Sequence, residues 1–240
     1  MKRDQVPGTN YIIFQDEEEF KYTSDSLILS SFVKGGQRAL DLGCGNGILS
    51  LRICPRFSEV HAVDKNKNVL EAFKKSIFLN KLEDKINLIE ENIFNLKNYY
   101  ATNYFDAVVF NPPYYDYENM KFETTQAKHF FDIEKSLYIV NYLLKNSGSL
   151  YIIYPTYRLA EVIYKINKNG LKVKNIINIH GNKNKKAKSS IIIAKKQANY
   201  GNDFSDFYIR DELEYTDEMK RVYRNEVILW FIFAQHLLEI

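Results

Sequence analysis

The sequence has little of what several protein classes require. Two cysteines, Cys44 and Cys54, in 240 residues are too few for a disulfide framework or a four-ligand zinc site, so we expect no bound metal. The longest apolar runs, 191–194 and 227–234, fall far short of the roughly 20 residues that a membrane span needs. No apolar stretch follows the basic residues at the N-terminus, so a secretory signal is not expected. These absences favour a cytoplasmic protein without membrane contact.

The basic residues are distributed unevenly along the chain. The net charge is +3, but the stretch 158–198 contains eleven basic residues and one acidic residue, so the remainder of the chain is acidic. An anionic partner that meets one region of the protein, such as a nucleic acid, would explain this asymmetry. A solvated lysine-rich surface would explain it as well, and charge alone leaves both interpretations open.

Apolar segments with strand and helix periods alternate along the chain. The segments with strand character are 38–42, 59–63, 86–89, 105–110, 149–154, 171–179 and 190–194. The segments with helix character are 26–33, 48–54, 68–79, 133–144 and 159–166. This alternation predicts an α/β fold with a doubly wound, Rossmann-like sheet of seven mostly parallel strands. The last strand should be antiparallel, because the loop before it is too short for a helical crossover.

We expect additions to this core at both ends of a single domain. Residues 11–22 predict two short strands around an acidic turn, and residues 216–240 predict one amphipathic helix. The expected organisation is a hairpin and helix over the ligand site (1–36), the core (37–198) and a strand and helix packed on the core (199–240). A monomer is the expected state.

A glycine-rich turn, DLGCGNG (41–47), follows the first core strand, and Asp64 ends the second. Ligands of doubly wound folds bind at this edge, where an aspartate can accept hydrogen bonds from two ribose hydroxyls. A dinucleotide turn would have its third glycine one residue later, and Asp41 would repel a pyrophosphate. S-adenosylmethionine has no phosphate and carries an ammonium and a sulfonium, which suit Asp41. The alternative is a turn with a structural role alone. The expected cofactor contacts in this region are Asp41, Gly43, Gly45, Asn46, Gly47 and Asp64.

Asn92 follows the third core strand, with Glu91 beside it. In such folds an acid at this place usually meets the adenine amine of the methyl donor. An amide oxygen can accept the same hydrogen bond, so we add Asn92 to the expected cofactor contacts.

The segment Asn111-Pro112-Pro113-Tyr114 follows the fourth core strand. The prolines fix the backbone and remove two N–H donors, so the Asn111 side chain and the Pro112 carbonyl offer two hydrogen-bond acceptors. The exocyclic amine of a base is a poor nucleophile, because its lone pair is conjugated with the ring. Two acceptors placed off the ring plane favour a pyramidal nitrogen and stabilise the positive charge that develops as it is methylated. Tyr114 can stack on the base. These four residues are the predicted catalytic residues, and a proline-rich structural turn is the alternative.

Taken in order, DLGCGNG, VDKN (63–66) and NPPY (111–114) resemble the motifs of class I S-adenosylmethionine-dependent methyltransferases that modify planar amines. The segment 20–32, Ala127-Lys128-His129, and Pro155 with Arg158 are similar to the bacterial tRNA1(Val) adenine-37 N6-methyltransferases. The resemblance implies the class I methyltransferase fold, S-adenosylmethionine as cofactor and methylation of adenine 37. It adds Thr23, Lys65 and Asn111 to the cofactor contacts. Members of that family tend to have an acid where this chain has Phe130, so we expect His129 to be structural.

The resemblance also makes tRNA the expected partner. We expect basic side chains near the end of the sheet to contact the RNA backbone, namely Arg158, Lys183, Lys185, Lys186 and Lys188. The affinity for RNA should then fall as the salt concentration rises. The same amine chemistry could instead act on ribosomal RNA, on DNA adenine or on a release-factor glutamine. Release-factor enzymes usually carry a helical N-terminal domain and DNA enzymes a separate recognition domain, and neither is visible here. A non-catalytic RNA-binding module with the same fold is the third possibility.

Overall fold

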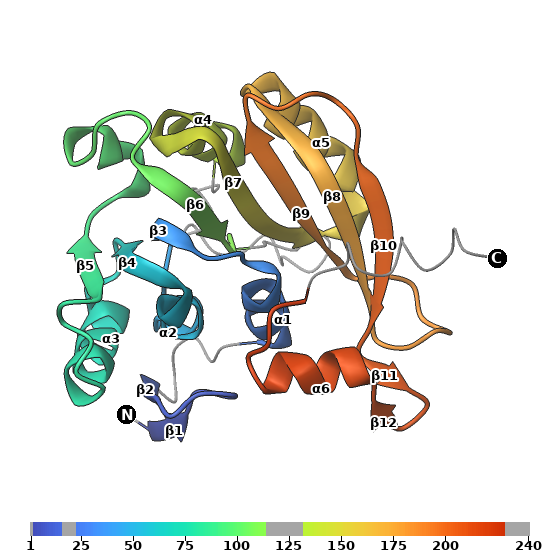
Figure 1. Cartoon of the computed structure of the whole chain (residues 1–240), viewed down its shortest axis with the longest axis horizontal. Coiled ribbons are helices and arrows are strands. Elements are labelled where there is room, and N and C mark those ends of the chain that lie inside the picture. The colour runs from blue at the N-terminus through green and yellow to red at the C-terminus, as the bar shows by residue number, and fades with distance from the viewer. Residues whose placement is uncertain (1, 16–22, 114–131, 229–240) are drawn as a thin grey trace, which may run out of the picture.

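A central sheet of eight strands organises the part of the chain that the computed structural model describes, residues 2–15, 23–113 and 132–228 (Figure 1). Its strands are β3 (Gly36–Leu42), β4 (Phe57–Asp64), β5 (Ile86–Glu90), β6 (Phe105–Phe110), β7 (Leu144–Pro155), β8 (Leu171–His180), β9 (Ser189–Lys196) and β10 (Asp203–Tyr208). They lie in the order β10-β8-β9-β7-β6-β3-β4-β5. All neighbours pair in parallel except β9, which is antiparallel to both β7 and β8.

The predicted doubly wound α/β fold is therefore confirmed, including its antiparallel strand. The sheet has one strand more than the predicted seven, because β10 adds in parallel to the outer side of β8. The segment DFSDFY carries two aspartates, which weaken its apolar alternation. Charged residues are a common feature of edge strands, since they discourage pairing with another chain.

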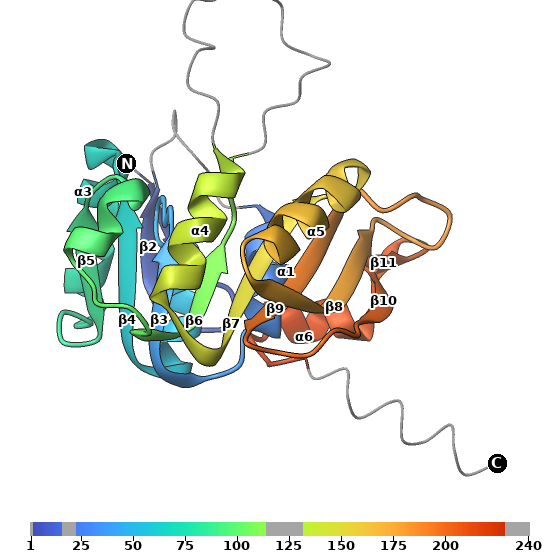
Figure 2. The same ribbon diagram turned by 90° about the horizontal axis from the view of Figure 1, so that it is seen from above.

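Helices cover both faces of the sheet and bury two hydrophobic cores. On one face lie α1 (Ser24–Phe32), α2 (Ile48–Ile53), α3 (Lys67–Leu79) and α6 (Asp217–Tyr223), and on the other α4 (Ile133–Leu143) and α5 (Leu159–Lys168). In Figure 1, α4 and α5 lie above the sheet, and Figure 2 shows them nearest the viewer. Short 3₁₀ turns, η1 (Cys54–Arg56), η2 (Ile93–Asn98) and η3 (Thr156–Arg158), join strands and helices. Helix α3 illustrates how a helix covers the sheet, because its buried Leu70, Phe73 and Ile77 recur at helical spacing.

The N-terminal residues form a hairpin that docks on α3. Strand β1 (Lys2–Gln5) pairs antiparallel with β2 (Ile12–Gln15). The backbone amide of Ile12 donates to the Asn80 side chain (2.8 Å) and that of Phe14 to the Ser76 hydroxyl (2.9 Å). Of the two strands expected over 11–22, the first is thus present with β1 as partner, and residues 16–22 lie outside the described residues.

The prediction of a single helix over 216–240 is wrong. Helix α6 ends at Tyr223, and Asn225 has a left-handed backbone with φ of 58°. The amides of Asn225 and Glu226 turn back to the carbonyls of Val222 and Arg221, which completes a helix C-cap. A small two-stranded sheet, β11 (Arg210–Asp211) with β12 (Glu214–Tyr215), precedes α6. Within the described residues, no helix has the length and apolar character to cross a membrane.

Candidate active site

The predicted site residues converge where the winding of the sheet reverses. Strands β4 and β5 lie to one side of β3, whereas β6 and β7 lie to the other. Leu42 of β3 pairs with Val63 of β4 and with Phe110 of β6. The glycine turn, Asp64 and Asn111 therefore lie at the ends of three adjacent strands, all at one edge of the sheet. This is the switch point at which doubly wound folds bind ligands.

The three glycines of the turn all have left-handed backbones, with φ of 72° at Gly43, 52° at Gly45 and 83° at Gly47. A side chain at Gly43 or Gly45 would meet no atom of the described chain within 4 Å, so open space adjoins the backbone there. A β-carbon at Gly47 would lie 2.2 Å from the ring of Phe73. The first two glycines leave room for a ligand, and the third permits close packing of the turn on α3.

Asp41 is completely buried just before this turn. One carboxylate oxygen accepts hydrogen bonds from the backbone amide (3.0 Å) and the hydroxyl (2.6 Å) of Ser50 in α2. The other oxygen, Oδ1, has no hydrogen-bond partner among the described residues. Burial raises the pKa of Asp41 to about 7, against the lowering effect of the Ser50 hydrogen bonds. A buried carboxylate oxygen without a donor suits a ligand that brings one, such as an ammonium group.

Asp64 braces the glycine turn. Its two carboxylate oxygens accept from the backbone amides of Gly45 and Asn66, each at 2.9 Å. These two contacts were not expected from the sequence. Each carboxylate oxygen has capacity for a further donor, so the expected hydrogen bonds from ribose hydroxyls are compatible with this geometry.

The remaining predicted cofactor residues lie around the same edge. Asn46 is buried, and its side chain accepts from the amide of Ile48 (3.3 Å). Lys65 and Thr23 are exposed, and Thr23 is the N-cap residue of α1. The side-chain oxygen of exposed Asn92 accepts from the amide of Phe94 (3.0 Å), which makes Asn92 the N-cap of η2. The Asn92 oxygen therefore already has a structural role that was not expected from the sequence.

Glu91 organises the segment next to Asn92. It accepts from the Tyr99 hydroxyl (2.7 Å), the Asn95 side chain (2.9 Å) and the Asn92 amide (2.7 Å). These hydrogen bonds, that of Tyr99 first, lower the pKa of Glu91. The ionised Glu91 carboxylate is thus a hydrogen-bond acceptor next to Asn92.

Asn111 is half-buried at the end of β6, and its side-chain nitrogen donates to the Ser26 hydroxyl oxygen at 3.0 Å. Pro112 is buried and Pro113 is exposed. Ser26 belongs to α1, 85 residues earlier in the chain, so no linear pattern could have linked it to Asn111. Tyr114 and the stretch 127–130, with His129 and Phe130, lie outside the described residues.

The lysine-rich loop 181–188 reaches the same edge of the sheet. Ser189 of β9 pairs with Pro155 at the end of β7 and with Ile179 near the end of β8. The amide of Thr156 donates to the carbonyl of Lys188 (3.0 Å), which fixes the loop to β7. The expected RNA-contacting lysines of this loop are all exposed, namely Lys183, Lys185, Lys186 and Lys188. Lys183 lies 3.5 Å from Asp211, in a solvent-exposed pair of little energetic weight.

Arg158, the fifth expected RNA contact, is held by the protein itself. Its guanidinium donates two hydrogen bonds, of 2.7 and 2.8 Å, to the carboxylate of Glu161. The hydrogen bond from Arg158, together with Lys165, lowers the pKa of Glu161 to about 2. Arg158 was expected to be available for phosphate, whereas the structure gives it an intramolecular carboxylate partner.

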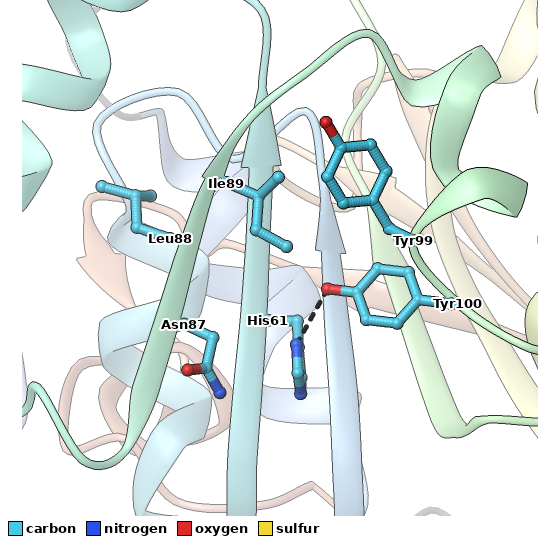
Figure 3. A pocket seen from close by; sticks show the side chains of 6 residues that line it. All are labelled: His61, Asn87, Leu88, Ile89, Tyr99 and Tyr100. Atoms are coloured by element: carbon cyan, nitrogen blue, oxygen red, sulfur yellow. Dashed lines mark hydrogen bonds between the residues drawn. The ribbon is translucent and has the colours of Figure 1, made fainter.

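A pocket that no sequence pattern predicted lies between the outer strands β4 and β5 and the segment after η2 (Figure 3). Its lining residues are His61, Asn87, Leu88, Ile89, Tyr99 and Tyr100. His61 and the Tyr100 hydroxyl are 2.8 Å apart, and burial lowers the pKa of His61. The rings of Tyr100, Tyr104 and Phe105 stand edge-on to His61. None of the predicted site residues that the structure describes lines this pocket. No group of metal-binding side chains gathers anywhere in the described ranges.

Comparison with known proteins supports one family. A family model described as "Methyltransferase domain" matches residues 33–200, more than half of the chain. A tRNA1(Val) (adenine(37)-N6)-methyltransferase of Cytophaga hutchinsonii is 22% identical over 89% of this chain and 93% of that protein. A putative ribosomal RNA large subunit methyltransferase of Methanocaldococcus jannaschii is 31% identical over 44% of this chain and 31% of that protein. The crystal structure of a predicted O-methyltransferase from Agrobacterium tumefaciens has a TM-score of 0.70 and 18% identity, and covers 85% of this chain and 98% of that chain.

Proposed function

The chain belongs to the methyltransferase domain family, and from that premise we propose that it methylates the N6 amine of an adenine in tRNA with S-adenosylmethionine as donor. The proposed position is adenine 37 in the anticodon loop of tRNA1(Val), the activity named for the Cytophaga hutchinsonii relative. The second candidate substrate is an amine of ribosomal RNA, which the name of the Methanocaldococcus jannaschii relative favours.

The observation that carries the proposal is the position of Asn111. It follows Phe110, which pairs with Leu42, so its side chain leaves the sheet beside the open glycine turn. The acceptors of the Asn111 amide and the Pro112 carbonyl suit the two protons of a planar amine. The hydrogen bonds from the amine to these acceptors strengthen as its nitrogen becomes positive. These hydrogen bonds therefore lower the reaction barrier more than they strengthen binding of the ground state. The proton becomes acidic once the nitrogen is methylated, so no separately tuned base is needed.

Several residues fit the proposed donor. When bound, S-adenosylmethionine supplies a methyl group on a positively charged sulfur. The Oδ1 of Asp41, which has no hydrogen-bond partner in the described part of the chain, suits its ammonium, and Gly43 and Gly45 leave room beside the backbone. Asp64 would accept from the ribose hydroxyls and Asn92 from the adenine amine. Asn46, Gly47, Thr23, Lys65 and Asn111 complete the proposed set.

The lysine-rich loop is the proposed contact with the RNA backbone. Its four exposed lysines lie at the edge of the sheet that also carries Asn111. We assign Arg158 a weaker role, because Glu161 already neutralises it. Tyr114 is the proposed stacking partner of the target base.

The direct test is incubation with radiolabelled donor and separate pools of tRNA, ribosomal RNA, DNA and release factor. We expect label in tRNA, as N6-methyladenine. The Asn111→Ala variant should lower the rate by about a hundredfold or more while donor affinity, measured by calorimetry, stays within a few-fold. Label in ribosomal RNA alone would favour the second candidate. A normal rate in Asn111→Ala would remove the proposed role of that amide.

A further inference from the structure

We propose that Ser26 is a positioning residue that holds the Asn111 side chain in its working position, an inference that rests on the proposed amine methylation. The Ser26 hydroxyl oxygen accepts the hydrogen bond from the Asn111 side-chain nitrogen at 3.0 Å. Ser26 is 5% exposed, so water does not compete freely for this contact. The two residues come from different elements, the first turn of α1 and the end of β6.

The chemistry makes the orientation of this amide decisive. The two ends of an asparagine amide have nearly the same shape, but one accepts a hydrogen bond and the other donates. In the structure the donating end is the one bonded to Ser26, so the oxygen is directed away from that hydroxyl. A target amine also donates. With the amide turned over, two N–H groups would face each other and the developing positive charge would lose its acceptor.

The helix that carries Ser26 is itself firmly held. Arg52, which is fully buried, donates to the Ser30 hydroxyl at 2.6 Å, and Arg56 donates to the carbonyls of Ser30 and Val33 at 2.8 Å. The amide of Ser26 donates to the carbonyl of Thr23 at 3.2 Å, within the first turn. Because α1 is anchored in this way, the Ser26 hydroxyl keeps a fixed position and restricts the motion of the Asn111 side chain.

The test compares Ser26→Ala with the conservative Ser26→Thr, which keeps a hydroxyl group. Ser26→Ala should lower kcat about tenfold to a hundredfold, the cost of a mispositioned catalytic group, and leave KM for RNA and donor affinity within about twofold. Ser26→Thr should recover most of kcat. The matched control is Ser136→Ala in α4, a buried serine whose hydroxyl donates to the Asp132 carbonyl at 2.7 Å. It should lose stability comparable to Ser26→Ala, by melting temperature, with an unchanged kcat.

A double-mutant cycle separates positioning from a general structural effect. If Ser26 acts through Asn111, adding Ser26→Ala to Asn111→Ala should not lower kcat further. An additional drop in the double variant, or equal losses of kcat in Ser26→Ala and Ser136→Ala, would overturn the inference.

Failure of this inference is distinguishable from failure of the proposed function. An active wild type, an impaired Asn111→Ala variant and a normal Ser26→Ala variant would overturn the role of Ser26 and keep the proposed function. A wild-type protein that methylates none of the substrate pools would overturn both.

Discussion

At the scale of single residues, Asp41 connects protein stability with ligand binding. Its pKa is raised to about 7 by burial, and the neighbouring Asp64 adds to the increase. Folding therefore favours the protonated carboxyl. A cationic ligand at Oδ1 of Asp41 would favour the ionised form instead, so donor binding near neutral pH should release a proton from this group.

The first prediction concerns stability against pH. Between pH 4 and 7 the unfolded chain ionises Asp41 while the native protein keeps it protonated, so unfolding releases a proton and stability falls as pH rises. With a native pKa of about 7, this contribution amounts to about 4 kcal/mol across that range and levels off above it. Urea denaturation of the wild type and Asp41→Asn at pH 5 and pH 7 measures it. The free energy of unfolding of the wild type minus that of Asp41→Asn should fall from pH 5 to pH 7. A difference that does not change with pH would contradict the prediction.

The second prediction concerns Asp64. Asp64→Ala should weaken donor binding by about tenfold or more, since it removes the proposed ribose acceptor and the brace of the glycine turn. Turnover at saturating donor should fall much less. Calorimetry with S-adenosylhomocysteine and steady-state kinetics separate the two effects. Glu59→Ala, a change to a carboxylate at the other end of β4, serves as control. Normal donor affinity in Asp64→Ala would refute the assignment.

Sequence patterns predict the position of candidate site residues that lie at a strand end. Asp41, Asp64 and Asn111 could be predicted to lie close together because parallel strands end at one edge. The partners that orient them could not. Ser26 meets Asn111 across 85 residues, and only the folded sheet brings them together. Ser50 is nine residues from Asp41, yet a serine on a short helix has nothing in its local sequence that marks such a contact.

At the scale of elements, the packing of the glycine turn on α3 is tight. Both Gly43 and Gly47 have left-handed backbones, but only at Gly47 does a β-carbon clash, 2.2 Å from Phe73. Alanine substitutions at these two glycines can therefore distinguish the cost of backbone strain from the cost of steric overlap with Phe73.

The third prediction uses that contrast. Gly43→Ala should destabilise the protein by about 1 kcal/mol, the cost of a left-handed backbone for alanine, and should also weaken donor binding. Gly47→Ala should cost about 3 kcal/mol, because overpacking against Phe73 adds to the same strain. Chemical denaturation measures both. Equal losses at the two positions would show that Phe73 moves aside freely.

The elements that sequence periodicity predicted well are those with continuous apolar faces. Strand β6 was predicted with the bounds that the structure gives it, because FDAVVF is almost wholly apolar. A strand was expected within 199–240, but the bounds of β10 and its pairing with β8 were not predicted, because Asp203 and Asp206 interrupt its pattern. The end of α6 was missed as well. The cap at Asn225 interrupts a segment whose apolar residues continue beyond it, and composition does not reveal a change of backbone direction.

At the scale of the whole molecule, the four exposed lysines of the 181–188 loop lie toward one end of the sheet. The lysine-rich loop joins β8 and β9, whereas α3 packs beside β5 at the other end. RNA that enters the site from the loop side would therefore meet positive charge before it reaches Asn111.

The fourth prediction follows from this distribution. Replacing Lys183, Lys185, Lys186 and Lys188 together by alanine should weaken tRNA binding at low salt. It should also reduce the slope of log affinity against log salt by up to about 0.9 for each phosphate that the loop no longer neutralises. Filter binding over a salt series measures both quantities. Exposed lysines on and after α3, Lys74, Lys75 and Lys81, provide the control substitutions. An unchanged slope after the loop substitutions would exclude the loop as the RNA-binding surface.

Arg52 joins distant parts of the chain in a way that bears on biosynthesis. Its guanidinium donates to the carbonyls of Pro7 (2.5 Å) and Val222 (2.6 Å), which belong to early and late segments. On the ribosome every proposed catalytic and donor-binding residue emerges before Val222 does. The hydrogen bond from Arg52 to Val222 can therefore form only after α6 has been translated, so this link between early and late segments is completed after every proposed site residue has emerged.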